Sequence, residues 1–190
     1  MAETKDHLWR AQDGPAEPLE ELVKSGAHPL GLDVGTSKVV AARRDSRDVA
    51  CTFQLNAFMP VPYSPVTERT IQQQSEIHYF RDGGEIVIFG SATERFANMF
   101  NAETRRTMAD GLINPNEKLA WPVLEQILKT LVPKPSAPNE VLAFSVPAAP
   151  PGREAQLPYH EATLRKFLQY LGYRAMAVNE GLAVIFSELE

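Results

Sequence analysis

The chain has 190 residues, of which 44% are hydrophobic and 23% charged, as is typical of a globular protein with one good core or two small ones. Its formal net charge of −5 gives no electrostatic reason to expect nucleic-acid binding. The single cysteine, Cys51, excludes an intrachain disulfide framework and favours a reducing, cytoplasmic compartment. Because Cys51 stands in an apolar run, we expect it to be buried. No run is long enough to span a membrane, and the four histidines lack the spacing of a zinc site.

Residues 1–27 form an acidic segment that lacks the apolar core of a signal peptide. We predict an N-terminal tail with one weak helix over residues 18–24. The alternative is a helix that docks on a partner, with Trp9 as its anchor.

Three strands in meander order are predicted from apolar runs, at residues 29–34, 38–44 and 49–58. We expect Phe53, Phe58 and Tyr63 to belong to the core. Pro60, Pro62 and Pro65 then predict an interruption of regular structure and a hinge into a smaller unit.

The smaller unit contains a predicted hairpin, with strands at residues 76–80 and 85–89 around Asp82-Gly83-Gly84. A helix is predicted to follow, with Ser91 as its N-cap and Glu94 completing a capping box.

The second half of the chain alternates helices with strands. Apolar periodicity predicts helices over residues 115–131 and 159–171 and from residue 179 onwards, with strands at 140–146 and 173–178. Asn114 and Pro115 are the expected cap and first residue of the first helix. Meander strands followed by β/α units predict an α/β fold with a mixed sheet flanked by helices.

The most informative motif is Gly31-Leu32-Asp33-Val34-Gly35-Thr36-Ser37-Lys38. An apolar strand leads to Asp33 and then to a Gly-Thr-Ser turn, whose backbone N–H groups and hydroxyls suit phosphate oxygens. The carboxylate at the strand end suits the water shell of Mg²⁺. The order is not that of a P-loop, and no G-x-G-x-x-G is present. The alternative is an ordinary strand–turn–strand with a surface carboxylate.

Together with this motif, four later segments resemble the actin-like ATPase superfamily, which includes actin, MreB and FtsA. They are Gly90-Ser91-Ala92, Asp110-Gly111-Leu112-Ile113, Ser145-Val146-Pro147 and the segment 173–183. The first motif is closest to that of FtsA and the middle segment to that of MreB. The resemblance spans residues 28–190 and corresponds to the first lobe of these proteins.

The resemblance implies a ribonuclease-H-like core of residues 28–58 and 107–190, with a small inserted subdomain at residues 59–106. It further implies that Asp33 holds Mg²⁺ through water and that Glu180 positions the attacking water. The phosphates of ATP would be bound by Gly35, Thr36, Ser37 and Lys38.

The chain departs from the superfamily pattern in three ways. Gly181 replaces a proline, the loop 147–158 is longer than usual, and the second phosphate motif and the adenine-contacting motif are absent. We expect those motifs to lie beyond Glu190, in a second lobe. The chain by itself is therefore expected to hydrolyse nothing and to bind nucleotide weakly at most.

In the intact protein, the resemblance implies binding and slow hydrolysis of Mg-ATP in a cleft between two lobes, coupled to self-association into filaments of a cytoskeletal or cell-division type. Two alternatives stay open. One is a non-catalytic scaffold or adaptor that acts through protein contacts, and the other is a lobe of a sugar or acetate kinase. The choice between ATP and GTP is open too, because the base-contacting residues are missing. A two-metal nuclease is excluded, since the strand at 140–146 offers no inward carboxylate.

Overall fold

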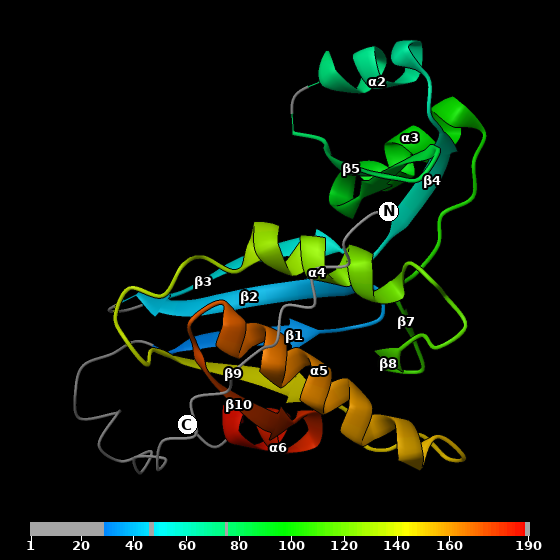
Figure 1. Ribbon diagram of the computed structural model, residues 1–190. Coiled ribbons are helices and arrows are strands. Elements are labelled where there is room, and N and C mark those ends of the chain that lie inside the picture. Colours follow the sequence, from blue (N-terminus) through cyan, green and yellow to red (C-terminus); the bar gives the residue numbers. More distant parts are fainter. Residues whose placement is uncertain (1–28, 46–47, 75, 189–190) are drawn as a thin grey trace, which may run out of the picture.

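A five-stranded mixed sheet forms the larger part of the computed structural model (Figure 1), which describes residues 29–45, 48–74 and 76–188. The strand order is β10-β9-β1-β2-β3. The strands are β1 Leu30–Val34, β2 Lys38–Asp45, β3 Asp48–Leu55, β9 Val141–Val146 and β10 Arg174–Asn179. β1, β2 and β3 pair antiparallel, whereas β1, β9 and β10 pair parallel. The predicted α/β class and ribonuclease-H-like mixed sheet are confirmed. The predictions for residues 1–27 lie outside the described residues.

Helices α4 (Ala120–Leu131) and α5 (Leu157–Tyr170) lie on one face of this sheet in Figure 1. β1 alternates between buried and more exposed positions, so that Leu30, Leu32 and Val34 face the core. The two helices supply the matching apolar stripes, and the shared cluster includes Val123, Leu124, Ile127, Leu128, Leu164, Phe167 and Leu168. The amphipathic period of the helices therefore fixes which face of the sheet they cover.

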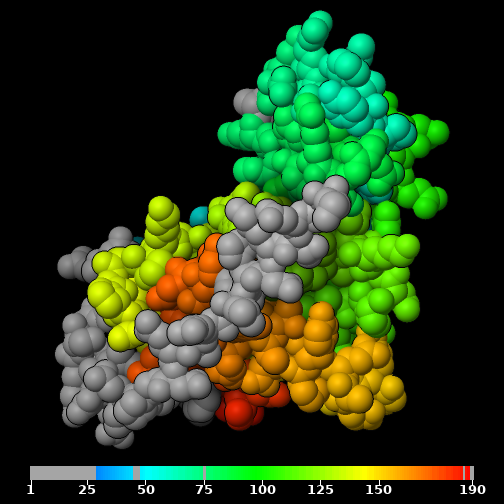
Figure 2. Space-filling view, in the orientation of Figure 1, coloured from blue at the N-terminus to red at the C-terminus, as the bar shows by residue number. Residues whose placement is uncertain are grey.

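A second, three-stranded antiparallel sheet has the order β4-β6-β5. Its strands are β4 Phe58–Pro62, β5 His78–Asp82 and β6 Glu85–Phe89, and helices α2 (Pro65–Gln72) and α3 (Thr93–Phe100) accompany them. Ile71, Ile86, Ile88 and Phe96 form part of a separate apolar cluster. These elements project from the main body in the space-filling view (Figure 2). The exact domain boundaries stay a prediction.

The predicted hairpin is confirmed, with Gly83 at a φ of +54° between β5 and β6. The prediction of one strand over residues 49–58 is wrong. The chain leaves the large sheet at Asn56-Ala57, and β4 then begins in the other sheet.

Pro60 and Pro62 do not interrupt regular structure as predicted, because β4 is an edge strand. Gly90 N donates to Ala57 O and Tyr63 N donates to Gly84 O, so the odd-numbered residues of β4 bond to β6. The two prolines fall at the even positions, where an N–H would point away from the sheet, and they remove no ladder hydrogen bond. Pro65 likewise starts a helix, α2, which Ser64 caps.

Three local predictions are wrong for identifiable reasons. α4 begins at Ala120 rather than at residue 115, because turns around Asn114 and Glu117 precede it. Ser91 does not cap a helix, since its hydroxyl donates to Gln54 Oε1 at 3.0 Å instead. Cys51 is exposed rather than buried, because it belongs to the edge strand β3.

Of the three aromatic residues predicted to be core, Phe58 is fully buried, whereas Phe53 and Tyr63 are exposed. Among the described residues, no helix has the length and apolarity needed to cross a bilayer.

His160 is a buried titratable residue on α5, 1% exposed. Ile113 N donates to its Nδ1 at 3.3 Å, while its Nε2 has no hydrogen-bond partner among the described residues. Burial lowers the pKa of His160 from 6.5 to about 4, so the ring is neutral in the folded chain.

We expect the pKa of His160 to make the folded chain acid-sensitive. The unfolded chain takes up a proton below pH 6.5, but folded His160 resists protonation until about pH 4, so the free energy of unfolding falls as the pH drops through this window. The expected loss is about 3 kcal/mol. His160→Gln keeps an acceptor for Ile113 N without titrating, and urea unfolding of this variant should lack that part of the loss. Equal losses in both proteins would contradict this assignment.

Candidate functional site

Three parallel strands bring polar residues to one edge of the large sheet. β1, β9 and β10 end at Val34, Val146 and Asn179. Because the strands run in the same direction, their carboxyl ends meet, and ligands of open α/β sheets bind at such an edge. This edge carries the predicted residues Asp33 and Glu180.

Asp33 is exposed and is held by a serine of the neighbouring strand. Ser145 Oγ donates to Asp33 Oδ1 at 2.7 Å, and Val34 N donates to Ser145 Oγ at 3.2 Å. Since the serine hydroxyl accepts from β1 and donates to the carboxylate, it fixes the orientation of Asp33 while leaving Oδ2 available. In the sequence, the Ser-Val-Pro strand end gives no sign of this role for Ser145.

Glu180 is the first residue of α6 (Glu180–Ser187). Partial burial of its carboxyl raises its pKa, and the negative charge of Asp33 raises it further. The two carboxylates are far apart in the chain, but β1 and β10 flank β9 in parallel, and their carboxyl ends bring Asp33 and Glu180 to the same edge of the sheet. Because the helix N-terminus favours negative charge, it offsets part of their repulsion.

The cap that Asn179 makes on α6 accounts for the absence of a proline after Glu180. Asn179 Oδ1 accepts hydrogen bonds from Gly181 N at 3.0 Å and from Leu182 N at 3.3 Å, which caps α6. A proline at position 181 has no N–H to donate, so the departure from the superfamily pattern is coupled to this cap.

The 35–38 turn is a tight hairpin connection. Gly35 N donates to Lys38 O at 3.0 Å, and a Cβ on Gly35 would lie 2.9 Å from that carbonyl oxygen, so only glycine fits. Thr36 and Ser37 are exposed at its tip, and within the described residues their backbone N–H groups have no acceptor. Such free N–H groups suit an anion. Lys38 is already in contact with a ring, its Nζ 4.9 Å from the centroid of Phe53.

Asn56 supports this turn from inside the protein, where its side chain is fully buried. Its Nδ2 donates to Gly35 O at 2.8 Å, and its backbone N donates to Ser37 O at 2.9 Å. Its Oδ1 accepts from the Thr107 hydroxyl. Sequence reasoning missed Asn56, and its position after the apolar run 49–55 was the only available signal.

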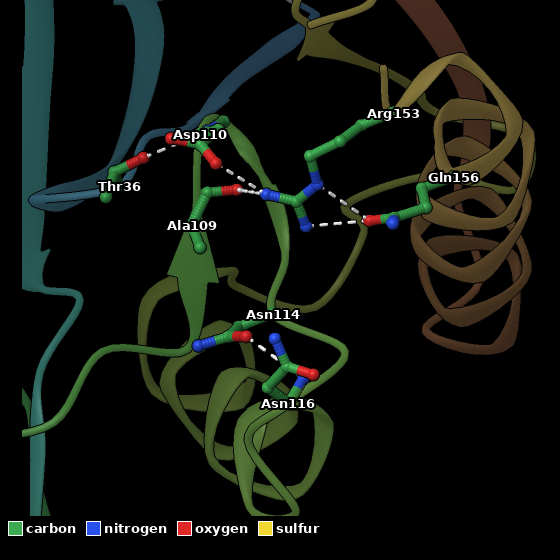
Figure 3. A network of polar contacts seen from close by, with 8 residues as sticks. Thr36, Ala109, Asp110, Asn114, Asn116, Arg153 and Gln156 are labelled. Atoms are coloured by element: carbon green, nitrogen blue, oxygen red, sulfur yellow. Dashed lines mark hydrogen bonds and ion pairs between the residues drawn. The ribbon is translucent and has the colours of Figure 1, made fainter. Parts of the chain in front are cut away.

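A network of polar contacts links the turn to two later segments (Figure 3). Gly111 N, in the hairpin between β7 (Met108–Ala109) and β8 (Leu112–Ile113), donates to Thr36 Oγ1 at 3.3 Å. Arg153 Nη1 donates to Ala109 O at 3.0 Å and to Asp110 Oδ2 at 2.7 Å. The Asp110-Gly111 motif and the long loop 147–158 therefore meet beside the turn.

The side chains available at this edge determine which metal ion the site can hold. No group of three or more metal-ligating side chains exists in the described part of the chain. One exposed carboxylate beside free amides does not make a closed metal cage, but it fits Mg²⁺ that keeps its waters and is bound largely through phosphate oxygens.

One solved structure similar to this chain is that of AlfA from B. subtilis plasmid pLS32, determined as a filament structure. The two chains share 13% sequence identity with a TM-score of 0.43, and the match covers 84% of this chain. This chain spans 58% of the AlfA chain. No curated protein sequence matches the chain.

A family model matches the chain over residues 29–190. This range includes the strands, the turn and both carboxylates of the site described above. The model is that of Volactin, and it bears out the actin-like resemblance that the motifs indicated. The chain belongs to the Volactin family.

Proposed function

We propose that the chain forms one wall of an Mg-ATP site in a cytoplasmic, filament-forming actin-like protein. The observation that carries this proposal is the convergence of three features at one sheet edge. They are the free N–H groups of Thr36 and Ser37, the serine-held carboxylate of Asp33, and the neighbouring carboxylate of Glu180. The buried side chain of Asn56 holds the turn in this shape, and the two carboxylates stand at the same sheet edge, which supports a ligand site there.

Each residue has a distinct role in this proposal. The amides of Thr36 and Ser37, together with the Lys38 ammonium, bind phosphate oxygens, and Gly35 allows the tight turn. Asp33 accepts hydrogen bonds from waters around Mg²⁺, which would neutralise charge on the phosphates. Glu180 orients a water molecule and accepts its proton, for which a raised pKa is favourable.

The filament part of the proposal rests on the actin-like motifs and on the family. Nucleotide state would act on the angle between two lobes and so on contacts between subunits. If no triphosphate binds at this edge, the scaffold alternative is favoured instead.

The turn can be tested in the chain itself by amide NMR. We expect millimolar Mg-tripolyphosphate to shift the backbone signals of Thr36 and Ser37, whereas adenosine should leave them in place. Gly35→Ala should abolish these shifts and cost about 1–3 kcal/mol of stability, because its Cβ meets the Lys38 carbonyl. Gly31→Ala is the matched control on the same strand, since its Cβ makes an ordinary 3.6 Å contact with Ala42 O.

Signals that move elsewhere, or do not move at all, would count against the phosphate assignment. Isothermal titration of the same chain with Mg-ATP should show weak binding at most. Micromolar affinity would contradict the expectation that one lobe alone lacks the base-contacting residues.

We expect the pKa of Glu180 to depend on the negative charge of Asp33. Asp33→Asn keeps an oxygen for the Ser145 hydroxyl but removes the negative charge. The pKa of Glu180 should therefore fall, while staying above its ordinary value because burial is the larger cause of its rise. Side-chain carboxyl NMR titration measures it. An unchanged pKa would mean that the charges do not interact.

The role of Glu180 is tested in a two-lobed protein that contains this chain. Glu180→Gln should lower phosphate release about 10²–10⁴-fold, the range for loss of a general base, while nucleotide affinity is retained. Steady phosphate release by this variant would remove Glu180 from the mechanism without affecting the binding proposal.

A further inference from the structure

Strand β3 leaves one edge of the large sheet open. It is the last strand in the order β10-β9-β1-β2-β3, and no described strand pairs with its outer side. Asn56 N bonds to Ser37 O, and hydrogen-bonded pairs alternate along antiparallel strands. The even-numbered residues of β3 therefore bond to β2. The N–H and C=O groups of Val49, Cys51 and Phe53 point outward.

This edge lacks the features that usually protect sheet edges from pairing. The strand reads DVACTFQL, with no proline or lysine and with one charged residue, Asp48, at its start. Val49 is 60% exposed and Phe53 is 54% exposed, and Cys51 between them is exposed too. An exposed edge with apolar side chains and outward-pointing backbone groups is a template for another strand.

We propose that β3 pairs antiparallel with β3 of a second copy of this chain, across a twofold axis beside Cys51. In this register Cys51 opposes Cys51 of the partner subunit, and Val49 opposes Phe53 of the partner subunit. The two large sheets then become one continuous sheet. The interface is isologous, as in most closed dimers.

The strand is self-complementary in charge and shape in this register. Asp48 opposes Gln54 of the partner subunit, so no like charges face each other. On one face, valine meets phenylalanine, an apolar pair of the kind that stabilises antiparallel strands. On the other face, Ala50 opposes Thr52 of the partner subunit, and both are small.

The end of β3 limits the register. Ser91 N donates to Gln54 Oε1 at 2.9 Å, so the segment after Phe53 is tied to the 3-10 helix Gly90–Ala92. Pairing centred on Cys51 places Val49–Phe53 at the middle of the interface and leaves Gln54, with its contact to Ser91, at the end of the paired segment. Val49 and Cys51 lie outside the proposed nucleotide site, whereas the Phe53 ring contacts Lys38, whose Nζ lies 4.9 Å from the ring centroid, so the pairing is tested without nucleotide.

Sedimentation velocity of the full 190-residue chain without nucleotide tests the proposal. We expect a monomer–dimer equilibrium that Phe53→Lys and Cys51→Lys abolish, because each places a charge on the edge, and the second sets two like charges face to face. Val66→Lys is the matched control. It changes a 73% exposed residue on α2 and should leave the dimer intact. Circular dichroism establishes that each variant is folded.

Cross-linking tests the register. Opposed residues of a hydrogen-bonded antiparallel pair have Cα atoms about 5.5 Å apart, so a short bismaleimide should join the two Cys51 thiols. In the control, Cys51→Ser with Val66→Cys moves the thiol to α2, and cross-linking should be lost. A chain that stays monomeric, a dimer that survives both lysine variants, or a dimer that does not cross-link through Cys51 would each overturn the proposal.

Discussion

The buried amide of Asn56 is the interaction on which the geometry of the site depends. It lies where the chain passes from one sheet to the other, and its hydrogen bonds occupy the carbonyl oxygens of Gly35 and Ser37. With those acceptors taken, the turn holds one shape and its N–H groups stay available at the surface. A buried amide without these partners would cost about 1–3 kcal/mol, so turn and junction stabilise each other. The Thr107 hydroxyl completes the set and ties the junction to the segment that precedes β7.

Much of the large sheet could be predicted from the sequence. The observed bounds of β1, β2, β9 and β10 differ from those of the predicted strands by no more than one residue at either end. Asn179 was predicted to open the last helix, and its side chain caps it. The grouping of Asp33 with Glu180 required the further assumption that their strands are parallel neighbours of β9, which came from the actin-like resemblance and not from periodicity.

The remainder depends on contacts that no local pattern contains. Asn56 looks like any polar residue in an apolar stretch, and only the change of sheet gives its amide buried partners. Cys51 and Phe53 were assigned to the interior because their run is apolar, but an edge position exposes them. The late start of α4 has a similar cause, since Glu117 Oε1 accepts from Leu119 N and holds a turn where periodicity predicts helix.

The two prolines of β4 give the two sheets opposite properties. At positions 60 and 62 the outer edge of β4 has carbonyl acceptors but no N–H donors. A further strand could therefore not form a regular set of hydrogen bonds with it there. Growth by strand addition is thus blocked on that side of the small sheet, while the last strand of the large sheet retains both kinds of group. The same polypeptide therefore carries one sheet edge, β4, that cannot accept a further strand at its prolines, and another, β3, that keeps the donors and acceptors a further strand needs.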